Sequence, residues 1–258
     1  MTPLLRTEHV LKAFGGVRAL DGCSVELEQG TVAGLIGPNG SGKTTLFNVI
    51  TGYERVDSGE VYLDGRPITN RSPERVFGLG IGRTFQLTRI FPRLTVSENM
   101  LVATQRRGGT VRNLLARSGA IEDRRRALDL LEFVGIAHLA ADLAGTLSHG
   151  QRKLLEFAYV LVADPAVMLL DEPAGGVNPS LINHIAVRIR ELNAQGKTFL
   201  IVEHNMDFVM NLCSRVTVID SGSVIASGRP EIIRSDPRVL DAYLGGAWRE
   251  DEDDASTP

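Results

Sequence analysis

Two kinds of hydrophobic pattern alternate along this chain, and together they outline its fold. Short runs of apolar and β-branched residues are typical of buried strands, and the clearest lie at 31–36, 167–170 and 198–202. Apolar residues recur with the helical period in other segments, most clearly at 94–102, 124–134 and 151–162. Strands that alternate with helices predict an α/β fold around a parallel sheet.

Two stretches depart from this alternation. Residues 4–30 contain short alternating strands with a turn at Gly15–Gly16, and 58–65 forms another strand closed by an Asp-Gly turn. These strands predict an antiparallel extension of the core. From about 87 to 165 the helical period dominates, so we expect a helical block inserted between two parts of one core.

The segments after the helical block complete the expected core. Asn178 is a good N-cap and Pro179 suits the first helical position, so a helix is expected to begin there. Another helix is predicted at 206–213, and the strands at 216–219 and 223–226 are expected to form a hairpin.

The composition is that of an ordinary globular protein, with 43% hydrophobic and 23% charged residues among 258. The net charge of -3 argues against bulk affinity for nucleic acid. Neither a secretion signal nor a run of about 18 apolar residues is visible, so we expect a cytoplasmic protein whose membrane role depends on a partner. Cys23 and Cys213 have no metal-ligand spacing, and we expect two buried thiols instead of a disulfide.

A glycine-rich segment between a strand and a helix carries the strongest chemical signal. It fits the pattern G-x-x-x-x-G-K-[ST] and consists of Gly37, Pro38, Asn39, Gly40, Ser41, Gly42, Lys43, Thr44 and Thr45. Backbone N–H groups of such a turn point at one spot, and the following helix adds partial positive charge there. Lys43 can reach the β- and γ-phosphates, and the Thr44 hydroxyl can ligate Mg²⁺. We therefore expect this phosphate loop to bind a nucleoside triphosphate.

Two carboxylates follow the buried strand at 167–170. A strand buried on both faces delivers them to the edge of the sheet at which the phosphate loop also lies. Asp171 can hold the shell of Mg²⁺ through water, and Glu172 can act as a general base on an attacking water. The alternative is a pair of surface acids at a strand end, which the phosphate loop in the same chain disfavours.

A second candidate for anion binding precedes the helix at 151–162. Ser148 and Gly150 would place a hydroxyl and a bare backbone N–H at its N-terminus, next to Gln151. The alternative is an ordinary helix N-cap. The position shortly before Asp171 favours the anion-binding interpretation.

In this order and spacing, the phosphate loop, Leu147–Gln151 and Leu169–Pro173 resemble the ATP-binding subunit of an ABC transporter. The resemblance covers roughly residues 4–245 and implies a single ABC ATPase domain. Its fold would be a P-loop NTPase (RecA-like) core with an antiparallel β subdomain and an inserted α-helical lobe. The expected parts are the core, at about 4–86 and 166–245, and the lobe, at about 87–165.

Three further residues match elements of this family. Gln86 matches a loop glutamine that ligates Mg²⁺ or orients water, and His204 matches a switch histidine that donates to the γ-phosphate. Phe14 matches an aromatic residue that stacks on adenine. The alternatives are a polar loop residue, a structural histidine and a core phenylalanine.

The resemblance also implies a mechanism with ATP and Mg²⁺ as cofactors. Two subunits would pair head to tail, with ATP between the Lys43 loop of one and the Ser148–Gly150 element of the other. Hydrolysis with Glu172 as the base would remove the bridging charge and let the pair open. His149 and Asn178 stand where glycine and aspartate are commoner in the family, and we expect His149 to contact the opposite subunit.

Several strings resemble one subgroup, the LivG-type ATP-binding proteins of branched-chain amino-acid importers. They are Gly82–Leu87, Glu98–Ala103, Pro173–Pro179, Val202–Asp207 and Leu240–Gly246. The implied partners are a second ATP-binding subunit, integral membrane permease subunits and, indirectly, a periplasmic solute-binding protein, with no nucleic acid. The subunit would lie at the cytoplasmic face of the inner membrane, held there by the permease.

Other functions stay open at this point. The alternatives are a soluble ABC-type ATPase, such as one in iron–sulfur assembly, a nucleotide-gated scaffold with little turnover, and an importer ATPase for urea or amides. The sequence leaves open which solute is transported and whether the second ATPase is an identical copy. The acidic tail at 247–258 is expected to be disordered, and it has no function that the sequence indicates.

Two segments are candidates for contact with the membrane partner. The arginine-rich segment Arg106–Arg126 either faces anionic lipid or the partner, or forms a solvated helix face. Phe91, Leu94 and Val96 either line a groove for a coupling helix of the permease, or pack the helical lobe.

Overall fold

The computed structural model describes residues 3–84, 90–105 and 117–243. The chain divides into two compact units, of which the first contains Met1–Val76 and Thr198–Pro258. The second unit is Phe77–Lys197. This second unit contains the strand at 167–170, which was predicted to belong to the core. The predicted division of the chain into a core and a helical lobe stays a prediction.

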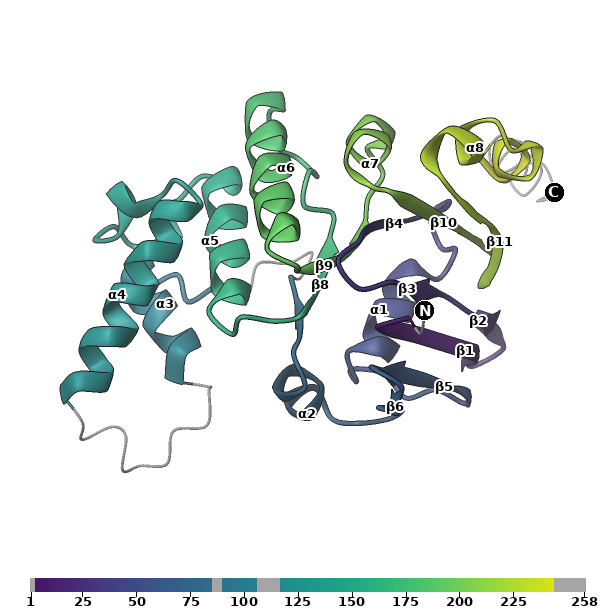
Figure 1. The fold of residues 1–258 in the computed structure, drawn as a ribbon, viewed down its shortest axis with the longest axis horizontal. Coiled ribbons are helices and arrows are strands. Elements are labelled where there is room, and N and C mark those ends of the chain that lie inside the picture. The colour runs from purple at the N-terminus through teal and green to yellow at the C-terminus, as the bar shows by residue number, and fades with distance from the viewer. Residues whose placement is uncertain (1–2, 85–89, 106–116, 244–258) are drawn as a thin grey trace, which may run out of the picture. The chain divides into compact units, whose positions relative to one another are not determined.

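Parallel strands form the centre of the first unit (Figure 1). They are β4 (Val32–Ile36), β9 (Thr198–Val202) and β10 (Arg215–Asp220), with β11 (Ser223–Gly228) beside β10. β4 pairs in parallel with both β9 and β10, and β11 forms an antiparallel hairpin with β10. Every residue of β4 and β9 is buried, as is typical of strands inside a parallel sheet. The predicted strands and hairpin are therefore confirmed.

Helices follow the two central strands of this sheet. α1 (Lys43–Ile50) comes after β4, and α7 (Met206–Leu212) comes after β9. Asn205 caps α7, because its side-chain oxygen accepts the N–H of Phe208 at 3.0 Å. The helices predicted behind the phosphate loop and at 206–213 are confirmed.

An antiparallel sheet completes the first unit, in the order β2-β1-β5-β6 with β3 also paired to β1. Its strands are β1 (Leu5–Phe14), β2 (Val17–Cys23), β3 (Glu26–Leu27), β5 (Ser58–Leu63) and β6 (Arg66–Pro67). Asp64 and Gly65 join β5 to β6 with positive φ angles of 48° and 71°, which a tight hairpin turn requires. The predicted antiparallel extension and its Asp-Gly turn are confirmed.

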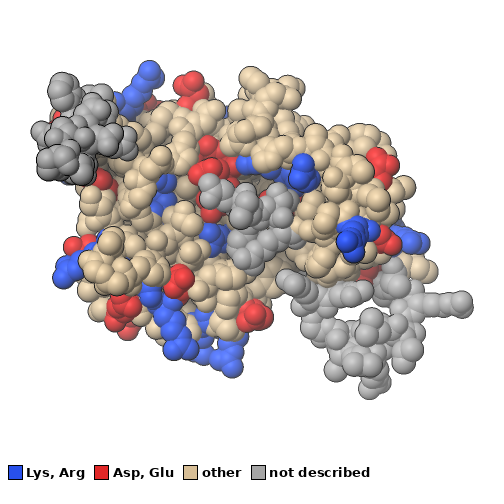
Figure 2. All heavy atoms as spheres, turned by 180° about the vertical axis from the view of Figure 1, so that it is seen from behind, with Lys and Arg blue, Asp and Glu red and all other residues tan. Residues whose placement is uncertain are grey.

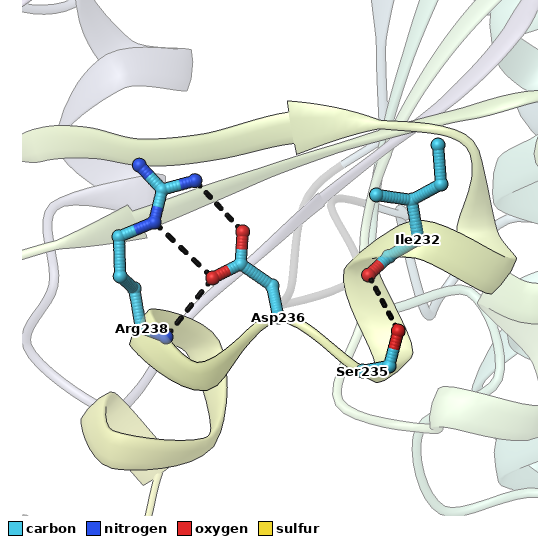
Figure 3. Close-up of polar contacts among 4 residues, drawn as sticks. All are labelled: Ile232, Ser235, Asp236 and Arg238. Carbon is cyan, nitrogen blue, oxygen red and sulfur yellow. Dashed lines mark hydrogen bonds and ion pairs between the residues drawn. The ribbon is translucent and has the colours of Figure 1, made fainter.

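Two short helices end the described chain, and the sequence analysis did not predict them. α8 (Pro230–Arg234) closes with a hydrogen bond from the Ser235 hydroxyl to the carbonyl oxygen of Ile232, 3.3 Å long (Figure 3). Asp236 then begins a helical segment at 237–243 and accepts the backbone N–H of Arg238 at 2.9 Å. Its carboxylate also binds the Arg238 guanidinium, and these hydrogen bonds lower the pKa of Asp236 (Figure 3).

The second unit contains the helix-rich part of the chain. Its two strands, β7 (Ile81–Arg83) and β8 (Val167–Asp171), pair in parallel. The helices are α3 (Val96–Gln105), α4 (Arg117–Phe133), α5 (His149–Leu161) and α6 (Pro179–Ala194), with 3₁₀ turns at Ala137–Leu139 and Ala144–Thr146. α2 (Pro73–Gly78) spans the boundary between the units in sequence. Met100, Leu131 and Leu155 from α3, α4 and α5 are fully buried and form the core of the helical part.

Both cysteines are buried, free thiols, as predicted. Burial raises the pKa of Cys23 and of Cys213 to about 12, so both are neutral and unreactive at physiological pH.

Within the described ranges, no helix combines the length and the apolarity needed to cross a membrane. Figure 2 shows one face of the molecule, on which acidic and basic side chains are interspersed. That nucleic acid is not a partner stays a prediction.

Candidate functional site

The phosphate loop connects β4 to α1 and holds its lysine inward. Gly42 precedes the first residue of α1 with a φ angle of 105°. Lys43 is 6% exposed, and its ammonium donates to the carbonyl oxygens of Gly37 at 2.8 Å and Pro38 at 2.7 Å. Ser41 Oγ lies 3.4 Å from the same nitrogen. The predicted strand–loop–helix arrangement is confirmed, and it surrounds a buried positive charge.

Backbone atoms crowd two glycines of this loop. A Cβ atom on Gly37 would lie 1.9 Å from the carbonyl oxygen of Ile219, and one on Gly42 would lie 2.3 Å from that of Ala19. Both glycines also have φ angles that L side chains rarely adopt, 154° and 105°. Backbone oxygens of β10 and β2 thus fix the loop from outside, and only glycine fits at these points.

The other residues of the loop differ in their exposure. Ser41 is buried, and its carbonyl oxygen accepts the N–H of Gly222 at 3.0 Å. Asn39, Gly40 and Thr44 are exposed, whereas Thr45 is half-buried. The exposed positions therefore lie beside the N-terminus of α1 and the buried Lys43, where an anionic phosphate is electrostatically favoured.

His204 lies at the same edge of the parallel sheet as the phosphate loop. β4 and β9 are parallel neighbours with Leu35 opposite Val202, so the segments that follow them leave from one edge. His204 is exposed, and its backbone N–H donates to a carboxylate oxygen of Glu203 at 3.0 Å. The same oxygen accepts the N–H of Asn205 at 3.2 Å, and Glu203 is 2% exposed. Glu203 was not among the predicted residues, although it directly precedes His204 and directly follows a buried strand.

Phe14 is an exposed aromatic residue at the end of β1. Its side chain is 47% exposed, so the alternative of a core phenylalanine is wrong. The ammonium of Lys12 lies 5.0 Å from the ring centroid, a distance at which a cation is attracted to the ring. An exposed ring of this kind has a face available for stacking, and adenine stacking stays a prediction.

In the second unit, Asp171 ends β8 in a buried ion pair. Its Oδ2 lies 3.0 Å from a guanidinium nitrogen of Arg83, and the two side chains are 2% and 6% exposed. The backbone N–H of Asp171 donates to the Thr84 hydroxyl at 3.1 Å. Burial raises the pKa of Asp171, and the hydrogen bond from Arg83 opposes that rise. Sequence reasoning did not find Arg83, because 88 residues separate it from Asp171.

Glu172 has an unusual backbone conformation. Its φ angle is 50°, in the left-handed region that non-glycine residues rarely adopt. The carbonyl oxygen of Glu172 accepts a hydrogen bond from the Lys153 ammonium and another from the N–H of Gly175 at 3.1 Å. Non-glycine residues held in this region cluster at functional sites. The conformation therefore supports a special role for this glutamate, and its part in catalysis stays a prediction.

The predicted element at Ser148 is the N-terminus of α5, closed by a capping box. Ser148 Oγ accepts the N–H of Gln151 at 3.3 Å, and the Gln151 side-chain oxygen accepts the N–H of Ser148 at 2.8 Å. A Cβ atom on Gly150 would lie 2.4 Å from Leu181 Cδ2, so glycine here lets α5 and α6 approach closely. Ser148 is therefore the N-cap of α5. The nucleotide contacts of Ser148, Gly150 and Gln151 stay predictions.

His149 and Asn178, which differ from the commonest residues of the family, both contact residues of their own chain. His149 Nε2 lies 3.3 Å from the carbonyl oxygen of Gly175, where the ring nitrogen acts as the donor. Asn178 caps α6, because its Oδ1 accepts the N–H of Leu181 at 2.9 Å. The predicted contact of His149 with an opposite subunit stays a prediction.

The oxygen donors of the predicted metal site suit Mg²⁺. Among the predicted ligands, Thr44 of the first unit carries a hydroxyl and Asp171 of the second carries a carboxylate, and hard oxygen ligands are those that Mg²⁺ prefers. That both bind one ion stays a prediction. No cluster of three or more histidine, cysteine or acidic residues could hold a metal within the described ranges. Gln86, the third predicted ligand, lies outside the described residues.

Comparison with known sequences gives two family matches. Residues 20–175 match the family described as ABC transporter, and residues 223–248 match the family described as branched-chain amino acid ATP-binding cassette transporter. The chain is 42% identical to a probable branched-chain amino acid transport ATP-binding protein LivG of Methanocaldococcus jannaschii, over 94% of this chain and 97% of that protein. It is 36% identical to the LivG protein of Escherichia coli (strain K12), over 95% and 99% of the two chains.

Solved structures give the same result. The ADP conformation of an ATP-binding cassette of an ABC transporter superimposes with a TM-score of 0.84 and 39% identity, over 95% of this chain and 100% of that chain. The dimeric structure of a bacterial ABC transporter cassette aligns with a TM-score of 0.79 and 26% identity, over 88% of this chain and 98% of that one. The predicted P-loop NTPase fold is therefore confirmed.

Proposed function

Because the chain belongs to the ABC transporter family of ATP-binding cassettes, we propose that it powers an importer for branched-chain amino acids by binding and hydrolysing ATP. The observation that carries this proposal is the similarity to LivG proteins over nearly the whole chain. The match at 223–248 supports it independently, because that segment lies outside the general ATPase motifs. The solute itself would be selected by other subunits.

Each predicted site residue has its own role in the proposed binding and hydrolysis of ATP. The phosphate loop and the N-terminus of α1 bind the triphosphate, and Lys43 balances its charge. Glu172 acts as a general base that takes a proton from the attacking water, and His204 donates to the γ-phosphate. Thr44, Asp171 and Gln86 would hold Mg²⁺, which would neutralise charge on the phosphate oxygens. Phe14 stacks on the adenine ring.

A second ATP-binding subunit completes each site. The Ser148–Gly150 element at the N-terminus of α5 would meet the γ-phosphate of ATP held by the phosphate loop of the other subunit. A bridging anion between two positive helix ends favours the closed pair, and hydrolysis weakens that bridge. The second subunit is either another copy of this chain or a paralogue.

The permease would hold this subunit at the cytoplasmic face of the inner membrane, with a periplasmic solute-binding protein on the other side. Two hydrophobic side chains in the second unit support a docking surface, because Phe91 is 44% exposed and Leu143 is 49% exposed. Their segments lie side by side, since the Ala144 N–H donates to the carbonyl oxygen of Leu94 at 2.9 Å. Val96 is fully buried, so the expectation that it lines the groove is wrong.

The proposal is tested by reconstituting the chain with its membrane subunits in proteoliposomes. We expect ATP-dependent uptake of leucine, isoleucine and valine, and loss of uptake with Glu172→Gln. Glu132→Gln is the matched control, because it changes an exposed glutamate of α4 in the same unit. Uptake of urea or amides instead would contradict the assigned solute. Purification with soluble partners only would favour a soluble ABC-type ATPase.

A further inference from the structure

One face of α5 contacts the loop that follows Glu172. His149 and Lys153 lie four residues apart in this helix, so their side chains share a face. His149 donates to the carbonyl oxygen of Gly175, and Lys153 donates to that of Glu172. We call residues 172–176 the Glu172 loop. Both of its ends are therefore held by the same helix.

The Lys153 contact acts on the peptide group that sets the direction of Glu172. The Glu172 carbonyl oxygen accepts the ammonium of Lys153 and the N–H of Gly175. Because a carbonyl with two donors has a fixed direction, the ψ angle of Glu172 is fixed with it. A φ angle of 50° is uncommon for glutamate, so the conformation persists only where neighbouring contacts enforce it. A hydrogen bond from an ammonium is one of the stronger contacts of this kind.

The His149 contact fixes the other end of the loop. Its Nε2 lies 3.3 Å from the Gly175 carbonyl oxygen, and a Cβ atom on Gly176 would lie 3.2 Å from the same nitrogen. Gly176 has a φ angle of 70°, so glycine meets both the conformational and the steric demand. The imidazole thus packs closely on the loop as well as donating to it.

We propose that Lys153 is a positioning residue for Glu172, and that α5 joins the Glu172 loop to the Ser148–Gly150 element of the same chain. This inference rests on the proposed function, in which Glu172 acts on one ATP while Ser148–Gly150 meets the other. A shift of α5 when its N-terminus binds ATP would move the loop that carries the general base of its own chain. His149 has the smaller share, because its ring nitrogen lies 3.3 Å from the Gly175 carbonyl oxygen, at the long end of hydrogen-bond distances.

The chain contains a matched contact that serves as a control. Asp164 also has a left-handed backbone, with a φ angle of 52°, and Lys197 donates to its carbonyl oxygen at 3.3 Å. Both residues belong to the second unit. Lys197→Met thus removes an ammonium from the same kind of turn without touching the Glu172 loop.

The test compares ATPase kinetics of the assembled transporter with Lys153→Met, Lys153→Arg and Lys197→Met. With Lys153→Met, we expect kcat to fall about 10-fold or more, because small misplacement of a catalytic group is costly, while KM for ATP changes less than about twofold. Lys153→Arg retains the charge and the donor, so it should restore most of kcat. Lys197→Met should leave kcat unchanged.

A second measurement separates positioning from a contact with ATP or a folding defect. In the Glu172→Gln background, Lys153→Met should leave ATP-dependent dimerisation unchanged, and the variant should stay folded at the assay temperature although the lost hydrogen bond lowers its melting temperature. An unchanged kcat in Lys153→Met, or an equal loss of kcat and of dimerisation, would overturn the inference. If Glu172→Gln itself keeps wild-type ATPase activity, the assigned base is wrong and the inference fails with it. This outcome can be told apart from the two outcomes that overturn only the role of Lys153, because Glu172→Gln is inactive in both of those.

Discussion

The phosphate loop and the Glu172 loop both have left-handed backbone, yet they stabilise it in different ways. In the phosphate loop the positive φ angles belong to Gly37, Gly40 and Gly42, which adopt them at little steric cost. In the Glu172 loop the positive φ angle belongs to Glu172, whose carbonyl oxygen accepts a hydrogen bond from Lys153 of α5. The first conformation is encoded within nine neighbouring residues, whereas the second depends on residues distant in sequence.

The charged side chains Lys43 and Asp171 also differ in how close in sequence their partners lie. Lys43 is held by carbonyl groups of its own loop, at 2.8 Å and 2.7 Å. Asp171 is held by Arg83, which is 88 residues away in the chain. A short motif therefore supplies both the positive φ angles and the partners of the lysine in the phosphate loop, while the carboxylates take their geometry from tertiary packing. Substitutions at the two places should differ in size and in kind.

The largest expected effect is at the carboxylate site. Arg83→Met leaves the buried Asp171 without its guanidinium partner, and we expect a loss of about 3–5 kcal/mol in unfolding free energy. Arg18→Met is the matched control, because Arg18 also lies 3.1 Å from an aspartate but is 72% exposed. Its loss should be at most about 1 kcal/mol. Equal losses in urea unfolding would show that burial of the ion pair does not matter.

The next effect is at the phosphate loop. Gly37→Ala places a Cβ atom 1.9 Å from the backbone oxygen of Ile219, and we expect a loss of about 3 kcal/mol together with loss of ATP binding. Gly40→Ala is the control within the same loop. Gly40 has a φ angle of 77° but no atom within 4 Å of the added Cβ, so only the conformational cost of about 1 kcal/mol remains. Urea unfolding without nucleotide distinguishes the two costs.

The sequence predicted those parts of the site that are encoded locally. The phosphate loop was found because its glycines, its lysine and the helix that follows form one contiguous motif. His204 and Asp171 became candidates because each stands at the end of a buried apolar run, and their roles stay predictions. Asn178 was found because a cap and a proline start a helix together, and Asn178 caps α6 as predicted.

The missing parts are those that depend on contacts between distant segments or on very few residues. Arg83 and Lys153 have no pattern of their own, and only the pairing of β7 with β8 and the packing of α5 assign them a role. Glu203 was visible as an acid at a strand end but was passed over for His204. α2, β7 and α8 are too short for a hydrophobic period to be recognised. The fully buried Val96 shows that apolar residues next to a loop can equally belong to the core.

A smaller effect is expected at the start of α6, next to the Glu172 loop. Asn178→Ala removes the acceptor for the N–H of Leu181, and we expect a loss of about 1 kcal/mol. Asn178→Asp keeps the acceptor and should retain the stability, because a carboxylate also suits the positive end of a helix. Asn205→Ala tests whether the equivalent cap of α7 in the first unit contributes a similar amount. A melting temperature that is unchanged by Asn178→Ala would refute the cap.

The smallest expected effect has the opposite sign. Glu172→Gly should abolish ATP hydrolysis yet stabilise the chain by about 0.5 kcal/mol, because the left-handed penalty of about 1 kcal/mol is relieved while the unfolded chain gains freedom. The contact from Lys153 survives the change, since it is made to the main-chain carbonyl group, and the repulsion between Glu172 and Asp171 disappears. Asp164→Gly is the control with the same backbone conformation, but it also removes the ion pair with Lys197, so its net effect should be close to zero. Urea midpoints at an unchanged slope measure both. A Glu172→Gly variant that is less stable than the wild type would mean that α5 holds this loop through the glutamate side chain and not through its backbone.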